Sequence, residues 1–250
     1  LYEITYQKDI FDKIVMDKDK KEIIKILNEN YDYKKSNNLV EGKGRNLVFL
    51  FHGPAGVGKT LTAEATSELL KKPLYQINIG DLELDPTKLE YNLKEIGKLC
   101  QRWDAVLLID EADIFLETRN FSDILRNTIV AVFLRFLEYS ENVIFLTTNR
   151  IETLDTAVRS RINLIVKYPK LGEDDRLEIW KNAIIDINVE DKSKLLKELC
   201  KLELNGREIS NMLNIAITML KNDAKEDGIR NYKFMKILDK CISINNECNF

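Results

Sequence analysis

The chain lacks several features that mark whole classes of protein. Its 250 residues include one histidine and four cysteines, and the cysteines show neither a C-x-x-C pair nor zinc-ligand spacing. This argues against a disulfide scaffold or a zinc site and favours a reduced, intracellular compartment, with the cytoplasm as the expected location. The residues concerned are His52, Cys100, Cys200, Cys241 and Cys248.

Long hydrophobic runs and a strong charge bias are also missing. No stretch approaches the roughly 18 apolar residues of a membrane span, and no signal-peptide pattern is present. The net charge is 38 − 41 = −3, so we expect no general attraction to nucleic acid or to anionic membranes. The chain starts at Leu1 without a methionine, which is consistent with a piece of a longer protein that carries targeting or substrate recognition elsewhere.

The most informative stretch that is present is GPAGVGKT at residues 53–60. The apolar run 47–51 precedes it, and helix-forming residues 61–70 follow it. Strand, glycine-rich turn and helix are the setting in which G-x-x-x-x-G-K-[ST] is a phosphate-binding loop rather than a plain turn. The glycines allow the backbone N–H groups to face inward, where they and the helix N-terminus attract an anion.

This motif assigns roles to its individual residues. Lys59 is expected to reach the β- and γ-phosphates of ATP, and the Thr60 hydroxyl to hold Mg²⁺. The predicted nucleotide-binding residues are Gly53, Pro54, Ala55, Gly56, Val57, Gly58, Lys59, Thr60 and Leu61.

Apolar runs and helical patterns alternate along the first two thirds of the chain. The runs predict strands at residues 47–51, 74–79, 105–109, 143–147 and 163–166. Their alternation with helices predicts a doubly wound α/β domain over residues 1–169. After Pro169 and Gly172 the strand signal ends, and four helical patterns predict a small helical domain over residues 170–250.

Two helical patterns predict a buried apolar face. In residues 17–27 the inward side chains are expected to be Ile23, Ile24 and Leu27. In residues 122–139 the predicted buried stripe comprises Ile124, Leu125, Ile129, Val132, Phe133, Phe136 and Leu137.

Acidic and amide side chains follow two of the predicted strands. Asp110 and Glu111 come directly after the apolar run 105–109, at the sheet edge where ligands bind in open α/β folds. Asp110 is expected to hold the water shell of Mg²⁺, and Glu111 to orient and deprotonate an attacking water. The alternative is that the pair caps the next helix. Asn149, after the strand at 143–147, is placed to hydrogen-bond the γ-phosphate or that water.

The motifs GPAGVGKT, VLLIDEAD (106–113) and FLTTNRIETLD (145–155), followed by a helical lid, resemble the AAA+ ATPases. More narrowly, the domain resembles a mostly uncharacterised group found largely in fungi. The resemblance implies a P-loop NTPase fold with parallel sheet order 5-1-4-3-2. It also implies a ring-like homo-oligomer, with a hexamer as the expected size and the nucleotide between neighbouring subunits.

The resemblance also implies roles for a polar residue and three arginines. Asn149 matches the sensor-1 position, and Arg161, with Arg159 as second candidate, lies where the family places arginine fingers. Arg207 resembles the sensor-2 arginine of the lid. The alternative for Arg159 and Arg161 is that they are two surface arginines on a short helix. The alternative for Arg207 is that it forms an ion pair with a local carboxylate.

One segment departs from the unfoldases of this family. The loop at residues 80–86 offers no aromatic residue before Tyr91, so threading of a polypeptide by an aromatic paddle is not expected. His52, just before the loop, is expected to be a packed strand-end residue rather than a base or a ligand.

The leading functional hypothesis is a Mg²⁺-dependent ATP hydrolase that remodels a macromolecular partner, with a protein as the expected client. The alternative is a clamp-loader-like or helicase-like nucleic-acid ATPase, against which the charge of −3 stands. A GTPase switch is not favoured, because the sequence contains no Asn-Lys-x-Asp guanine signature. A scaffold without turnover does not fit the presence of Lys59, Asp110 and Glu111 together.

Overall fold

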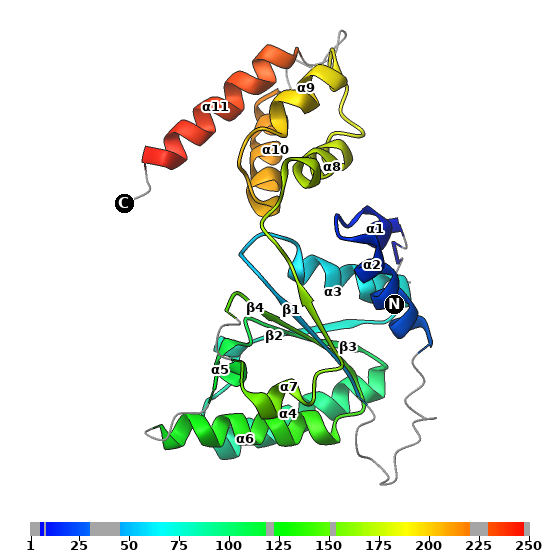
Figure 1. Cartoon of the computed structure of the whole chain (residues 1–250), viewed down its shortest axis with the longest axis vertical. Coiled ribbons are helices and arrows are strands. Elements are labelled where there is room, and N and C mark those ends of the chain that lie inside the picture. The colour runs from blue at the N-terminus through cyan, green and yellow to red at the C-terminus, as the bar shows by residue number, and fades with distance from the viewer. Residues whose placement is uncertain are drawn as a thin grey trace. The chain divides into compact units, whose positions relative to one another are not determined.

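The computed structural model describes residues 6–7, 9–30, 46–118, 123–150, 154–220 and 230–247. The chain divides into two compact units (Figure 1). The first comprises residues 1–54 and 58–168, and the second comprises residues 169–250 together with residues 55–57. Among the described residues, no helix combines the length and the hydrophobicity needed to cross a membrane.

A five-stranded sheet forms the centre of the first unit. All of its strand pairs are parallel, and its order is β2-β3-β4-β1-β5. Read from the other edge this is 5-1-4-3-2, so the predicted fold class and strand order are confirmed. The strands are β1 (Leu47–His52), β2 (Leu74–Asn78), β3 (Val106–Asp110), β4 (Val143–Thr148) and β5 (Leu164–Lys167).

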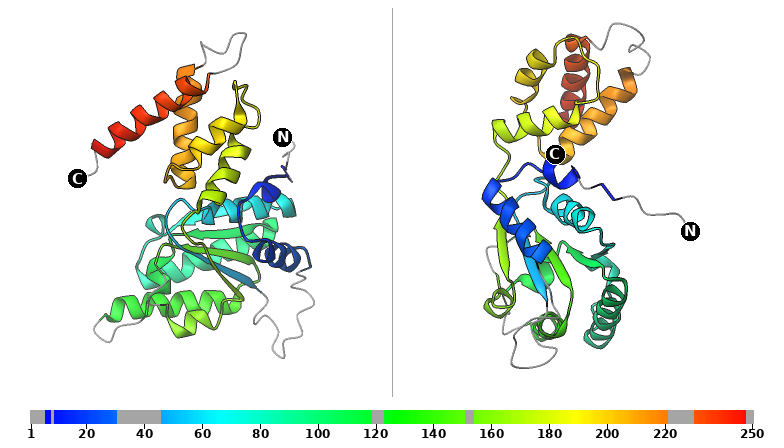
Figure 2. Two further views of the ribbon diagram at one scale, coloured as in Figure 1. Left: turned by 45° about the horizontal axis from the view of Figure 1, so that its top comes forward. Right: turned by 90° about the vertical axis from the view of Figure 1, so that its right-hand side faces the viewer.

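Helices cover both faces of this sheet. Figures 1 and 2 show α3 on one face and α4 with α6 on the other, and α1 and α2 pack against α3. The helices of this unit are α1 (Asp9–Lys13), α2 (Lys18–Asn30), α3 (Lys59–Leu70), α4 (Pro86–Trp103), α5 (Asp113–Leu116), α6 (Ile124–Tyr139) and α7 (Thr156–Arg159), with a 3₁₀ turn at Ile79–Asp81.

The central strands are buried on both faces, which explains their uninterrupted apolar sequences. One face carries Val48, Leu107 and Ile144, which pack with side chains of α4, α5 and α6. On β1 and β4, Phe49 stacks on Phe145 with ring centroids 4.8 Å apart. Successive side chains of each strand therefore serve two different hydrophobic layers.

Two details of the predicted helix faces are wrong. Ile124 and Leu125 are 78% and 58% exposed. They lie in the first turn of α6, whereas the first residue of α6 that belongs to the hydrophobic core cluster is Ile129. Ile23 is 45% exposed although its neighbour Ile24 is fully buried. Adjacent helical residues point about 100° apart, and α2 buries only the narrow side that faces α3.

The second unit contains four helices in its described residues, built around one apolar core. They are α8 (Glu173–Ala183), α9 (Lys192–Leu199), α10 (Gly206–Leu220) and α11 (Asn231–Glu247). The fully buried side chains of the core include Trp180, Leu195, Phe234 and Leu238.

The stacked pair on β1 and β4 generates a stability prediction. Phe145→Ala removes a fully buried ring, and we expect the free energy of unfolding to fall by about 3–5 kcal/mol. Urea unfolding followed by circular dichroism measures this loss. Tyr139→Ala, which truncates a side chain that is 60% exposed, is the control and is expected to change stability by about 0.5 kcal/mol or less. Equal effects of the two substitutions would contradict the packing described here.

Candidate functional site

The glycine-rich loop adopts a backbone that ordinary side chains disfavour. Gly53, Gly56 and Gly58 have φ angles of 146°, 72° and 99°. Gly58 is the N-cap of α3, and as a glycine it has no side chain that could accept a hydrogen bond from this helix end. The N–H groups of the first turn of α3 therefore lack a side-chain acceptor at the cap, as expected at an anion-binding helix start.

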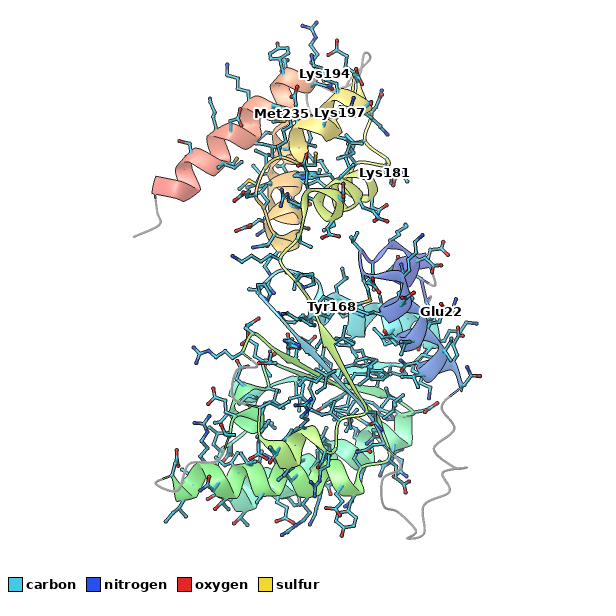
Figure 3. All side chains as sticks on the ribbon, viewed as in Figure 1. Glu22, Tyr168, Lys181, Lys194, Lys197 and Met235 are labelled. Carbon is cyan, nitrogen blue, oxygen red and sulfur yellow. The ribbon has the colours of Figure 1, made fainter. Side chains whose placement is uncertain are left out.

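The start of the loop is pinned by the residue that follows β5. The Tyr168 N–H donates to the His52 carbonyl at 2.8 Å, and a Cβ on Gly53 would lie 2.1 Å from the Tyr168 carbonyl oxygen. The Tyr168 hydroxyl (labelled residue in Figure 3) donates to Thr62 of α3 at 2.9 Å. Burial raises the pKa of Tyr168 well above its ordinary value, so this phenol stays protonated. Only glycine fits at position 53.

Lys59 is the only charged residue of the loop motif, and it is only 7% exposed. Its ammonium donates to the carbonyls of Gly53 at 2.8 Å and Pro54 at 2.6 Å. It also donates to Asn149 Oδ1 at 2.8 Å. The structure therefore brings together Lys59 after β1 and Asn149 after β4, two residues predicted to meet the same phosphate.

The two residues predicted to hold the metal also lie together. The Thr60 hydroxyl donates to the Asp110 carboxylate, with oxygen–oxygen distances of 3.1 and 3.3 Å. The Thr147 hydroxyl donates to the same carboxylate, and Gln76 Nε2 lies 3.5 Å from its Oδ2. Burial, and then the charge of Asp110, raises the pKa of the nearby Glu64 carboxyl.

Glu111 has an unusual backbone conformation. Its φ angle of 55° is in the left-handed region, which costs a residue other than glycine of order 1–3 kcal/mol. Its N–H donates to Thr147 Oγ1 at 3.0 Å, and the Ala112 N–H donates to the Thr147 carbonyl at 2.8 Å. The cap of α5 is Ala112, with no side-chain cap bond, so the capping role considered for Asp110 and Glu111 is not observed.

The two candidate arginine fingers have different surroundings. Arg161 is half-buried, and it donates to Glu138 Oε2 of α6 and to the Ala157 carbonyl, both at 3.0 Å. Arg159 ends α7 and is exposed. These positions leave the role of both arginines a prediction.

The sensor-2 candidate belongs to the second unit. Arg207 is exposed in the first turn of α10, where the Asn205 side chain accepts from the N–H groups of Arg207 and Glu208, each at 3.0 Å. The Glu208 carboxylate in turn accepts from the Asn205 N–H at 2.7 Å, which completes a capping box. In the same unit, the Gly206 N–H donates to the Gly56 carbonyl at 2.8 Å.

Several contacts were not anticipated from the sequence. Thr147, Gln76, Tyr168 and Asn205 each touch a predicted site residue, but a threonine or glutamine in a strand is ordinary. One signal in the sequence could have identified Thr147 as a residue near the site, namely its position two residues before Asn149 at the end of the same strand. Leu61, predicted to contact nucleotide, lies exposed in the first turn of α3.

These residues suit a nucleoside triphosphate with Mg²⁺. Mg²⁺ takes few protein ligands and keeps several waters, and a threonine hydroxyl beside one carboxylate is such a donor set. Within the described ranges, no cluster of three His, Cys, Asp or Glu side chains offers a metal site of another kind. Fold and site together define a P-loop nucleoside triphosphatase.

Comparison with known proteins gives the family. The sequence profile described as "ATPase family associated with various cellular activities (AAA)" matches residues 49–170. Residues 49–170, just under half of the chain, therefore form a domain of this family, and this domain is an ATP hydrolase. The narrower resemblance to a mostly fungal group stays a prediction.

Curated relatives are similar at low identity. A 26S proteasome regulatory subunit homolog of Methanothermobacter marburgensis is 27% identical over 67% of this chain and 49% of its own length. Lon protease of Campylobacter jejuni is 25% identical over 81% of this chain and 27% of its own. Human ATPase family AAA domain-containing protein 3A is 32% identical over 54% of this chain and 24% of its own length. The chain thus spans about half the length or less of these relatives.

The surroundings of His52 generate a prediction about pH. Burial, followed by the charges of Lys167, Lys59 and Lys20, lowers the pKa of His52 below 6.5. The unfolded chain therefore binds a proton more tightly, and stability is expected to fall as the pH drops through about 6.5 toward the folded-state pKa. Thermal unfolding of the wild type and of His52→Asn at about pH 7 and about pH 5.5 measures this. The wild type is expected to lose more stability over that interval, and equal losses would contradict the lowered pKa.

Proposed function

We propose that the chain binds and hydrolyses ATP with Mg²⁺ and uses this hydrolysis to remodel a macromolecular partner. The proposed partner is a protein. The observation that carries the proposal is the pairing across one sheet edge. There the Lys59 ammonium donates a hydrogen bond to Asn149, and the Thr60 hydroxyl donates one to Asp110. The four residues come from three separate motifs, and each of them has a role in triphosphate chemistry.

The loop supplies binding. The N–H groups of the glycine-rich turn and of the first turn of α3 would donate hydrogen bonds to the phosphate oxygens, and the Lys59 ammonium would exchange its carbonyl acceptors for phosphate oxygens. Thr60 and Asp110 would hold the magnesium ion and its waters. When bound, this ion neutralises charge on the phosphates.

Hydrolysis needs a base and an orienting group. The exposed Glu111 carboxylate would take a proton from the attacking water, while the water oxygen forms its bond to the γ-phosphorus. The bond from that phosphorus to the β,γ-bridging oxygen breaks, and ADP leaves with the bridging oxygen. The Asn149 amide would orient the water or the γ-phosphate.

We further propose that Arg161 completes the site of a neighbouring subunit in a ring of identical chains. Its guanidinium is held by Glu138 and by the Ala157 carbonyl of its own subunit, which would fix its direction before assembly. Arg159 is the second candidate for this role, and Arg207 is proposed to report nucleotide state to the lid.

The relatives support a protein as client. One is named as a homolog of a proteasome regulatory subunit and another as a protease. Without an aromatic residue in the loop at 80–86, a paddle-driven threading mechanism is not part of this proposal. A clamp-loader-like or helicase-like role is the alternative, and binding that strengthens steeply at low salt would favour it.

Glu111→Gln separates binding from turnover. Because the amide cannot accept the proton from water, we expect ATP hydrolysis to fall by about 10²–10⁴-fold while nucleotide affinity is retained. Phosphate release and the binding of a fluorescent ATP analogue measure the two quantities. Lys59→Ala is the complementary variant, in which the analogue should no longer bind. Unchanged turnover in Glu111→Gln would remove Glu111 from the proposed role.

Arg161→Ala tests the shared site. Binding should persist, and turnover should fall by about 10³-fold or more, since the arginine acts on the transferring phosphate. Mixing this variant with Glu111→Gln subunits should restore part of the activity, because some interfaces then hold both intact residues. Arg126→Ala, which removes a half-buried arginine paired with Glu117, is the control for loss of an ion pair. If the mixture stays inactive in rings shown to contain both variants, the arginine does not act between subunits.

A further inference from the structure

Thr147 is a buried polar residue of the 145–155 motif to which no role in the proposed chemistry has been assigned. It is the fifth residue of β4 and only 1% exposed. Its neighbour Thr148 is equally buried, but its hydroxyl has other acceptors for its proton, the Asp113 carboxylate and the Arg150 carbonyl. The two adjacent threonines therefore serve different partners, and only Thr147 touches both acids of the candidate site.

The bonds of the Thr147 hydroxyl use its donor and one acceptor site. A hydroxyl carries one proton and two lone pairs. The proton goes to Asp110 Oδ1, and one lone pair accepts the Glu111 N–H at 3.0 Å. One oxygen atom thus connects the side chain of the predicted metal ligand with the backbone of the predicted base.

This position matters for each of the two acids. Glu111 has a left-handed backbone, and the two N–H groups that follow Asp110 are both anchored on Thr147, one on the hydroxyl and one on the carbonyl. Asp110 has a second hydroxyl donor in Thr60, but Thr60 is itself a predicted metal ligand. Of the two hydroxyl groups that donate to Asp110, only that of Thr147 carries no second role in the proposed chemistry.

We propose that Thr147 is a positioning residue that fixes Asp110 and Glu111 relative to each other through its hydroxyl. The inference rests on the proposed function of the two acids. It predicts that the hydroxyl, and not the volume of the side chain, sets the geometry of the site. Valine matches the shape of threonine without the hydroxyl, and serine keeps the hydroxyl without the methyl group.

The experiment compares Thr147→Val, Thr147→Ser and a control, Thr66→Val. Thr66 is another fully buried threonine whose hydroxyl donates to the Thr62 carbonyl, so its loss reports the general effect of removing a buried hydroxyl. In Thr147→Val we expect kcat to fall by about 10–100-fold, the range seen when a residue that orients a site ligand is lost. Thr147→Ser should stay within about threefold of wild type, and Thr66→Val should keep its kcat.

A second readout uses no nucleotide. Hydrogen exchange at the Glu111 amide should be faster in Thr147→Val than in wild type, since the N–H loses its acceptor, and normal in Thr147→Ser. The Ala112 amide, bonded to the Thr147 carbonyl, should be protected in all variants and serves as the internal reference. If Thr147→Val does not fold, Thr147→Ala replaces it in both measurements.

Three kinetic results would overturn the inference. They are a Thr147→Val kcat within twofold of wild type, a loss that Thr147→Ser does not restore, and an equal loss in Thr66→Val. Unchanged exchange at Glu111 would also contradict it. A wild-type protein that does not hydrolyse ATP would instead defeat the proposed function, and the exchange measurement would still decide whether Thr147 holds Glu111.

Discussion

The parallel direction of all five strands is the constraint on which the site depends. It brings the carboxyl ends of β1, β3 and β4 to one edge, where the glycine-rich loop, the two acids and Asn149 follow them. Because β4 lies between β1 and β3, its end reaches both neighbours. Asn149 contacts Lys59 on one side, and Thr147 contacts Asp110 on the other. The strand order thus makes β4 the connection between the loop and the acids.

Much of this arrangement could be predicted from the sequence because it depends on local pattern. Continuous apolar runs indicate strands buried on both faces, and the spacing within residues 53–60 is specific to a phosphate loop. The contacts of Thr147 depend on the register that sets Ile109 opposite Leu146, and sequence periodicity does not contain it. Exposure of Ile124 and Leu125 likewise depends on where neighbouring elements end, not on helical spacing.

Lys59 and Arg161, the two cations proposed to act on the triphosphate, differ in the hydrogen bonds described above. Three contacts of Lys59 are to carbonyl and amide oxygens, which a phosphate can replace with a gain in electrostatic energy. Arg161 is held by the carboxylate of Glu138. A guanidinium keeps its charge at any ordinary pH and has further donors free for an anion while one side of it is paired. This difference suits the proposed roles, in which Lys59 rearranges when the nucleotide binds and Arg161 is presented to a neighbouring subunit in a fixed direction.

The grouping of residues 55–57 with the helical unit has a consequence for how this chain can be divided. The Gly56 carbonyl receives its hydrogen bond from Gly206, which lies 150 residues further along the chain. A fragment that ends at Tyr168 would keep every strand of the sheet yet leave the apex of its nucleotide loop without that donor. A cut after Tyr168, which suits the sheet, therefore separates Gly206 from the carbonyl to which it donates, and residues 55–57 are better kept on the same fragment as the helices.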